Sequence, residues 1–283
     1  MPPEGAAGLA GAWEALRGSS ATLALTLSAR ASPLAREADA GWLDPWAAPL
    51  LAQCPWDLRR AADDAALVRA VVVRSLVFDR LVRQACAERS VHAVASLGVG
   101  LCTRQGRLAP SLPGVGWIDA DLPEVIALRR LLLPSVAADP GRQVASALQD
   151  SAWLDAMPWQ EGRHFIVLLE GVAPYVPPSD IRHLLERLAV RVRRESCGCR
   201  VVLDYLHPDF VPIAAWQAGP AMLPVVSGFR DAAALVEGDT GFHVLQECQP
   251  FGLFSEAHRR FEDEFRGRHG HVPYAVACLE QGP

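Results

Sequence analysis

From residue 91 onward, short apolar runs that favour strands alternate with segments that favour helices. The apolar runs are continuous, which is typical of parallel strands covered by helices on both faces. The expected strands are 91–97, 115–121, 143–148, 165–170, 200–204, 242–248 and 271–279. The last two lie close together, which favours an antiparallel addition at one edge of the sheet. The chain is therefore predicted to form an α/β fold whose sheet is mostly parallel, with an antiparallel C-terminal strand.

The N-terminal region is rich in Ala and Leu with scattered Gly and Pro, and it favours short helices and turns. The expected helices are 9–17, 21–31, 45–53, 61–87, 122–133, 177–195, 229–237 and 254–267. We find no internal repeat and no low-complexity linker. The sequence thus predicts a single domain over 1–283, with a helical N-terminal cap at 1–88 and an α/β core at 89–283.

Composition argues against several classes of protein. Of 283 residues, 51% are hydrophobic and 21% are charged, which is the balance of a globular chain. A net charge of −5 argues against a broad nucleic-acid-binding surface. The apolar runs are broken before the roughly 18 residues that a membrane span needs, and 1–17 shows no signal-peptide pattern. We expect a cytoplasmic protein that binds neither nucleic acid nor membrane, and the sequence leaves the oligomeric state open.

The cysteines and histidines do not form a recognisable metal-binding motif. Seven cysteines are an odd number spread along the chain, which favours free thiols in a reducing compartment. Cys197 and Cys199 have no second Cys or His pair nearby at metal spacing. His269 and His271 similarly lack sequence partners and favour a surface turn. We therefore expect no metal site.

In a doubly wound sheet, ligands bind at the carboxyl ends of the strands. Gly98-Val99-Gly100 follows the first expected strand, Asp121 ends the second, Glu170 ends the fourth and Asp204 ends the fifth. Glycines let the backbone approach a ligand closely. A carboxylate after the second strand can accept hydrogen bonds from ribose hydroxyls. Acids at three strand ends therefore indicate a nucleoside ligand with positive charge.

The pattern of glycines and acids at the strand ends distinguishes between two possible cofactors. A dinucleotide site needs Gly-x-Gly-x-x-Gly so that a helix N-terminus holds the pyrophosphate, but Thr103 stands at the third position. S-adenosylmethionine has no phosphate, and its ribose hydroxyls, ammonium and sulfonium suit acidic residues. The sequence favours S-adenosylmethionine, and a nicotinamide-dependent oxidoreductase on a similar sheet stays as an alternative.

Three segments closely resemble the leucine carboxyl methyltransferase family, in particular its bacterial branch that includes O-methyltransferases of polyketide biosynthesis. These segments are Leu97–Arg104 (LGVGLCTR), Trp117–Ile126 (WIDADLPEVI) and Glu170–Val176 (EGVAPYV). The resemblance covers about residues 20–210. It implies a class I methyltransferase fold, S-adenosylmethionine as methyl donor, and methylation of a carboxylate or hydroxyl oxygen.

The resemblance also implies cofactor-binding residues. Gly98 and Gly100 match the glycines of the first cofactor loop, and Asp121 matches the acid that holds the ribose. Glu170 matches the acid near the methionine end, and Arg74 matches an arginine that reaches the cofactor carboxylate. Structural alternatives remain open, because the glycines can form a tight turn, Asp121 can cap a helix, and Arg74 can pair with a surface acid.

Further positions follow from the same resemblance. Arg30 matches a cap residue with a role like that of Arg74. Leu148 and Gln149 fall where the family lines the adenine pocket, and Asp150 is a neighbouring candidate for the exocyclic amine. Tyr175 matches a tyrosine at the rim of the substrate pocket.

Two positions depart from the family pattern. Cys102 stands where the family usually has Asp, which removes one acid beside the cofactor. The adenine segment 146–150 is slightly shifted. A catalytically impaired relative that acts as a binding or scaffold subunit is therefore a further alternative.

Methyl transfer is an in-line displacement in which the protein mainly aligns the reactants and excludes water. A carboxylate acceptor needs no general base, whereas a hydroxyl can need one, and His207 after the fifth strand is the candidate base. Tyr175 and Tyr205 are the other candidate catalytic residues, with ordinary aromatic packing as their alternative. Residues 206–228 are rich in Trp, Pro and Ala, so we expect a substrate lid here and a small, apolar acceptor.

Overall fold

The computed structural model describes residues 4–16, 19–38, 42–55, 64–133, 142–218 and 222–282. These residues contain a seven-stranded sheet with the strand order β3-β2-β1-β4-β5-β7-β6. The strands are β1 (Val91–Leu97), β2 (Gly116–Asp121), β3 (Arg142–Ala145), β4 (His164–Leu169), β5 (Gly198–Leu206), β6 (His243–Cys248) and β7 (Tyr274–Gln281). β7 pairs antiparallel with β5 and β6, and the other pairs are parallel. The predicted mostly parallel sheet with an antiparallel C-terminal strand is confirmed.

The strands differ from the predicted ranges mainly at their ends. β3 stops at Ala145 because the chain then turns, and the Ser146 N–H donates to the carbonyl of Asp121 at 2.8 Å. β7 begins at Tyr274 and not at 271. Pro273 immediately before it has no N–H to donate to a neighbouring strand, and its carbonyl accepts the His207 N–H at 2.9 Å.

Helices cover both faces of the sheet and build the cap. They are α1 (Glu4–Glu14), α2 (Ser19–Ala31), α3 (Leu34–Ala38), α4 (Ala47–Leu51), α5 (Ala65–Glu88), α6 (Arg104–Leu108), α7 (Pro123–Leu132), α8 (Ala152–Ala156), α9 (Pro178–Arg194), α10 (Val211–Ala218), α11 (Ala232–Leu235) and α12 (Glu256–His269). The sequence did not predict α3, α6, α8 and α10, which are too short to show a clear helical period. The predicted helical N-terminal cap is confirmed.

Two predicted helices begin later than expected because an aspartate caps each of them. The Asp64 carboxylate accepts the N–H groups of Ala66 and Leu67, so α5 begins at Ala65; 61–63 lie outside the described residues. The Asp231 carboxylate accepts the Ala234 N–H at 2.8 Å, and α11 spans only four residues of the predicted 229–237.

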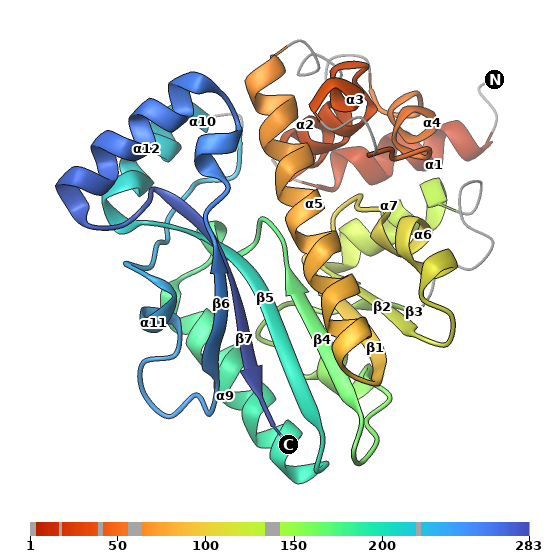
Figure 1. Ribbon diagram of the computed structural model, residues 1–283. Helices are drawn as coiled ribbons and strands as arrows, with labels where there is room; N and C mark the ends of the chain where they lie inside the picture. The colour runs from red at the N-terminus through yellow and green to blue at the C-terminus, as the bar shows by residue number, and fades with distance from the viewer. Residues whose placement is uncertain are drawn as a thin grey trace.

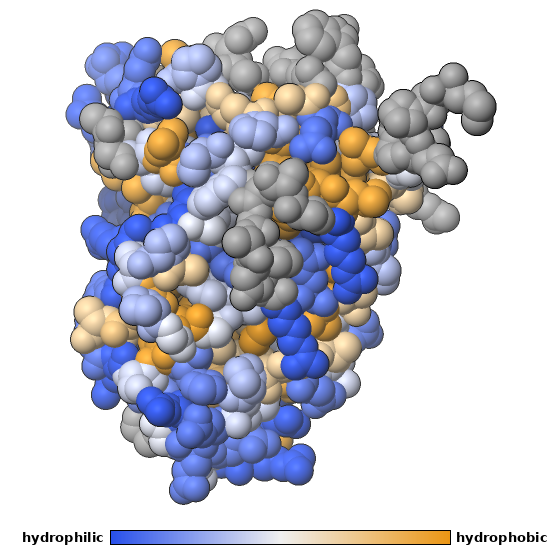
Figure 2. Space-filling view, turned by 90° about the vertical axis from the view of Figure 1, so that its right-hand side faces the viewer, coloured by the Kyte–Doolittle hydropathy of each residue, from blue (hydrophilic) through white to orange (hydrophobic). Residues whose placement is uncertain are grey.

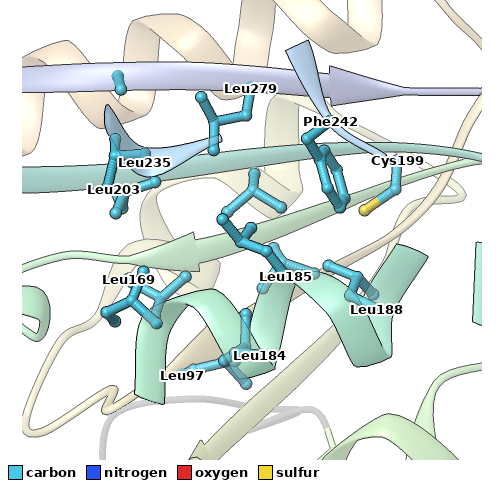
Figure 3. Packing of buried hydrophobic residues seen from close by; sticks show 14 of the residues in the cluster. Leu97, Leu169, Leu184, Leu185, Leu188, Cys199, Leu203, Leu235, Phe242 and Leu279 are labelled. Carbon is cyan, nitrogen blue, oxygen red and sulfur yellow. The ribbon is translucent and has the colours of Figure 1, made fainter. Parts of the chain in front are cut away.

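The larger hydrophobic core lies between the sheet and the helices α8, α9 and α11. On α9, Ile181, Leu184, Leu185 and Leu188 recur at helical spacing and are all buried. Figure 3 shows the α9 leucines pointing toward Leu97, Leu169 and Leu203 of the sheet. This packing fixes the position of the strand ends that carry the site.

The opposite face of the sheet packs against α5 and aromatic residues of the C-terminal part. The cap helix α2 packs against α4 and α5. Figure 1 shows α1–α4 together with α10 and α12 at one end of the sheet, and the C-terminus at the opposite end. The cap end is the end to which the carboxyl termini of the parallel strands point, so the cap covers the expected ligand site.

Figure 2, which faces the side of the β3 edge, shows apolar surface gathered near the cap end and mainly hydrophilic surface at the other end. Among the helices that the structure describes, none combines the length and the apolar character needed to cross a bilayer.

Candidate active site

Two adjacent cavities open at the carboxyl ends of the parallel strands. The residues common to both walls come from α2, β1 and the turn after β4; they are Thr22, Leu23, Leu97, Gly98, Gly171 and Tyr175. The first cavity is lined further by charged residues, including Arg30, Arg74 and Glu170. The second cavity has a volume of about 470 Å³ and a mainly apolar wall, which is within the size range of small-molecule sites.

The glycine loop after β1 forms part of both cavities. Gly98 and Gly100 have φ angles of +61° and +52°, which side chains rarely tolerate. A Cβ at Gly98 would lie 2.6 Å from Val172 Cγ2, and one at Gly100 would lie 2.7 Å from Leu23 Cδ2. Glycine at these positions therefore serves both the turn and the close approach of backbone to the cavity.

Asp121 at the end of β2 holds this loop in place. Its Oδ2 accepts the Gly100 N–H and its Oδ1 accepts the Leu122 N–H, each at 2.7 Å. Burial raises the pKa of this carboxyl, although both N–H groups oppose the shift. The N-cap position of α7 belongs to Leu122, so Asp121 is not the helix cap. Asp121 lines the second cavity, where the sequence predicted a ribose partner.

Glu170 at the end of β4 is engaged on both oxygens. Oε1 accepts hydrogen bonds from Arg74 Nε at 3.1 Å and from Ser75 Oγ at 3.0 Å, and Oε2 forms an ion pair with Arg104. Burial raises the pKa of Glu170, but Arg104 and Arg74 outweigh burial and hold the pKa well below its usual range. The carboxyl group is therefore ionised in the folded protein.

Glu170 is one member of a larger network of alternating charges. Arg104 Nε also contacts Asp79 Oδ1 at 2.6 Å, and Arg30 Nη1 contacts Asp44 Oδ2 at 2.6 Å. The network comprises the arginines and acids Arg30, Arg74, Arg104, Arg107, Asp44, Asp79, Glu170 and Asp204. Four positive charges thus face four negative charges, which offsets the cost of burying them.

Several members of this network were not predicted from the sequence. Asp79 lies among apolar residues of α5, and Asp44 lies in the cap, so neither follows a strand. The sequence did offer one signal for Asp79, namely an acid within an apolar helix. A carboxylate buried in such a helix requires a partner. Arg104 and Arg107 were visible near the glycine motif, but their carboxylate partners come from distant segments.

The second cavity has an apolar wall that suits an adenine ring. Leu148 and Gln149, the predicted adenine-pocket residues, line it together with Val125 and Trp153. The Gln149 side-chain amide donates to Asp180 Oδ2 at 2.6 Å. Asp150 does not occur among the described residues that line this cavity, and its Oδ2 accepts the Ala147 N–H at 3.0 Å.

The model of the leucine carboxyl methyltransferase family matches residues 8–189, which is more than half of the chain. The chain belongs to the leucine carboxyl methyltransferase family. This membership confirms the family predicted from the sequence. It agrees with the class I methyltransferase sheet and with S-adenosylmethionine as the predicted cofactor.

Among curated relatives, the chain is 32% identical over 194 residues to the tetracenomycin polyketide synthesis O-methyltransferase TcmP of Streptomyces glaucescens, covering 68% of each chain. It is 25% identical over 236 residues to a putative S-adenosyl-L-methionine-dependent methyltransferase of Mycobacterium marinum, covering 76% of each. A solved O-methyltransferase family protein from Burkholderia thailandensis aligns with a TM-score of 0.49 and 17% identity, over 79% of this chain and 62% of that one.

The residues of this family member fit S-adenosylmethionine. The methionine part of the cofactor carries one ammonium and one carboxylate, and the first cavity presents Glu170 together with Arg30 and Arg74. The nucleoside part has ribose hydroxyls and a flat ring, and the second cavity presents Asp121 and an apolar wall. The order of the polar and apolar walls thus matches the order of the groups in the cofactor.

Cys102, the departure from the family pattern, lines the first cavity. Its Sγ lies 3.7 Å from Arg104 Nη1. Because Arg104 already pairs with Asp79 and Glu170, the missing family acid does not leave this arginine without a carboxylate.

The three candidate catalytic residues of this methyltransferase differ in their position relative to the two cavities. Tyr175 lines both cavities, and burial raises the pKa of its hydroxyl. Tyr205 is buried in the core, where its hydroxyl donates to Glu247 Oε2 at 2.6 Å. His207 is buried against Phe265, with 5.2 Å between the ring centroids. Neither Tyr205 nor His207 occurs among the described residues that line the two cavities.

Proposed function

We propose that this methyltransferase transfers a methyl group from S-adenosylmethionine to a carboxylate or hydroxyl oxygen of a small, largely apolar metabolite. The observation that carries the proposal is the pair of adjoining cavities, one charged and one apolar, that meet at Gly98 and Tyr175. Their walls suit the two halves of the cofactor. The name of the Streptomyces relative supports an oxygen acceptor and a polyketide-like substrate.

When bound, S-adenosylmethionine supplies a methyl group that is already activated by the sulfonium charge. The protein then has to hold the two reactants in line and keep water out. We assign Arg30 and Arg74 to the cofactor carboxylate, Glu170 to its ammonium and Asp121 to the ribose. Tyr175 lies where the two cavities meet, so it is placed to contact the acceptor or to orient it.

The contacts of residues 222–228, which follow α10, are consistent with the proposed substrate lid over this site. Leu223 and Pro224 line the second cavity, and the Leu223 N–H donates to Thr22 Oγ1 at 3.2 Å. The N–H of Val226 donates to the carbonyl of Pro174 at 2.9 Å, next to Tyr175. A lid held between the cap and the turn after β4 can exclude water from the reacting groups.

Because His207 and Tyr205 do not occur among the described residues that line the cavities, we assign them no proton-transfer role. A carboxylate acceptor is already a nucleophile and needs no base. For a phenol acceptor, Tyr175 is the titratable side chain that lines both cavities within the part of the chain that the structure describes.

The proposal is tested with methyl-tritiated S-adenosylmethionine and a panel of aromatic polyketide phenols and carboxylic acids. We expect label in an organic-extractable product for at least one acceptor class. Mild alkali then distinguishes the atom methylated, since methyl esters release methanol and methyl ethers do not. Matched aromatic amines and thiols complete the panel, and transfer to these alone would contradict O-methylation. Binding of the cofactor product without transfer to any member of either class would favour the scaffold alternative.

A further inference from the structure

Three potential metal ligands meet at the base of the lid, outside the two cavities. His207 follows β5, Asp209 lies in the short turn that leads into α10, and His269 is the last residue of α12. One ligand atom from each of these side chains lies within 4.8 Å of the others. The two histidines are 62 positions apart in the sequence, so the spacing patterns used for metal motifs could not reveal them.

The separations suit a single bound ion. Asp209 Oδ2 lies 2.8 Å from His269 Nδ1 and 3.6 Å from His207 Nδ1. Zinc binds imidazole nitrogen and carboxylate oxygen at about 2.0–2.2 Å, which places neighbouring ligand atoms roughly 3–3.5 Å apart. Small side-chain adjustments would therefore bring all three atoms into a first coordination shell.

The surroundings hold the two rings before any ion binds. Phe265 packs against both, with centroid distances of 5.2 Å to His207 and 4.2 Å to His269. The His207 N–H donates to the Pro273 carbonyl at 2.9 Å, which fixes the backbone. The Nδ1 atom of His207 accepts the Asp209 N–H at 3.2 Å, a bond that a metal ion would replace.

The three side chains differ in their exposure to solvent, and the difference leaves one side of the site open to water. His207 is buried and His269 is partly buried, whereas the Asp209 side chain is 59% exposed. An ion bound here would therefore keep contact with solvent on one side, where water can complete its coordination. Two imidazoles and one carboxylate form a nitrogen and oxygen donor set that suits zinc and its neighbours in the transition series.

We propose that His207, Asp209 and His269 bind one divalent transition-metal ion of the zinc class. The ion joins the turn before α10 to the C-terminal end of α12, two elements that lie at the same end of the molecule (Figure 1). Its role is structural, because it fixes the base of the lid while the cofactor cavities lie elsewhere. No metal site was expected from the sequence, because the three ligands come together only in the folded chain.

The experiment is a titration of the chelator-treated protein with Co²⁺, followed by displacement with Zn²⁺. We expect one Co²⁺ per chain, with visible ligand-field bands and no thiolate charge-transfer band in the near ultraviolet. Both His269→Ala and Asp209→Ala should weaken binding at least tenfold. The control His243→Ala removes an exposed histidine on β6 and should leave the affinity unchanged.

Failure of folding is detected separately, by binding of S-adenosylhomocysteine to each variant. Asp209 is exposed, so its substitution should leave the fold intact. The proposal is overturned if the wild type takes up no Co²⁺, if uptake gives a thiolate band from the cysteines, or if Asp209→Ala binds as tightly as the control variant.

Discussion

At position 98, the absence of a side chain keeps the wall of the proposed cofactor site in place. Glycine is favoured here for two separate reasons. The backbone is left-handed, and a Cβ would lie only 2.6 Å from Val172 Cγ2. Gly162 shares the first reason, with φ of +70°, but a Cβ there would meet nothing within 4 Å. The two glycines therefore form a matched pair for separating backbone strain from obstruction of the site.

We predict that Gly98→Ala and Gly162→Ala each cost about 1–2 kcal/mol of stability from the left-handed backbone. Only Gly98→Ala should also weaken S-adenosylhomocysteine binding, by tenfold or more, because its methyl group displaces the cavity wall. Calorimetric titration of both variants measures this. Equal affinities in the two variants would show that the glycine loop does not contact the cofactor.

Glu170 links the site to the pH dependence of stability. Its folded pKa is lowered, so its stabilising contribution is complete above the unfolded pKa of about 4.3 and is lost as the pH falls below that value. We predict that Glu170→Gln costs about 3 kcal/mol near neutral pH, because Arg74 and Arg104 lose a buried partner. The difference from wild type should shrink progressively below pH about 4.

Urea unfolding of both proteins over a series of pH values checks this prediction. The exposed acid Glu186 on α9 provides the control, and Glu186→Gln should stay within about 0.5 kcal/mol of wild type. A Glu170→Gln difference that is constant down to pH 3 would contradict the assigned ion pairs.

Cys102 bears on whether the protein is an active enzyme. Arg104, whose Nη1 lies 3.7 Å from Cys102 Sγ, already has two carboxylate partners, and the surrounding network is balanced at four charges of each sign. We therefore predict that Cys102→Asp changes cofactor affinity by less than about tenfold, or about 1.4 kcal/mol. A much larger gain, measured by the same titration, would indicate that the natural site is impaired and would favour the scaffold alternative.

At the scale of elements, the strand ends explain which site residues the sequence could reveal. Gly98 and Glu170 directly follow apolar strands and Asp121 is the last residue of β2, so their place at one edge of the sheet follows from topology. Tyr205 also follows this logic but lies outside the cavities, because successive strand residues point to opposite faces. Asp204 contacts Arg74, whereas the neighbouring Tyr205 points to Glu247.

The remaining site residues depend on packing between elements. Asp44 and Asp79 reach the network because the cap helices pack against α5, and no local pattern encodes that arrangement. The short helix α10 was missed for a related reason, since its apolar sequence has no periodic face and none of its residues is buried.

Substitution of Trp216 on α10 tests whether this helix is part of the substrate lid. Its side chain is 83% exposed, so Trp216→Ala should change stability by no more than about 0.5 kcal/mol. If the lid contacts the acceptor, the KM for the acceptor should rise severalfold while cofactor affinity stays constant. Val190→Ala on α9, another exposed apolar residue, is the control. Unchanged steady-state kinetics in the Trp216 variant would remove this residue from the acceptor site.

At the scale of the whole molecule, the charge network joins the cap to the core around the proposed cofactor site. Arg30 comes from α2, Asp79 from α5, Arg104 from α6 and Glu170 from the end of β4. Binding a ligand between these parts should therefore stabilise the folded chain as a unit.

The most direct test is thermal unfolding with and without S-adenosylhomocysteine, with NAD as the control. A ligand at about 100 times its dissociation constant adds roughly 2.7 kcal/mol of stability, which for a chain of this size raises the Tm by about 5–10 °C. We predict this rise with S-adenosylhomocysteine and none with NAD. No shift with S-adenosylhomocysteine, or an equal shift with NAD, would contradict the assignment of the two cavities to S-adenosylmethionine.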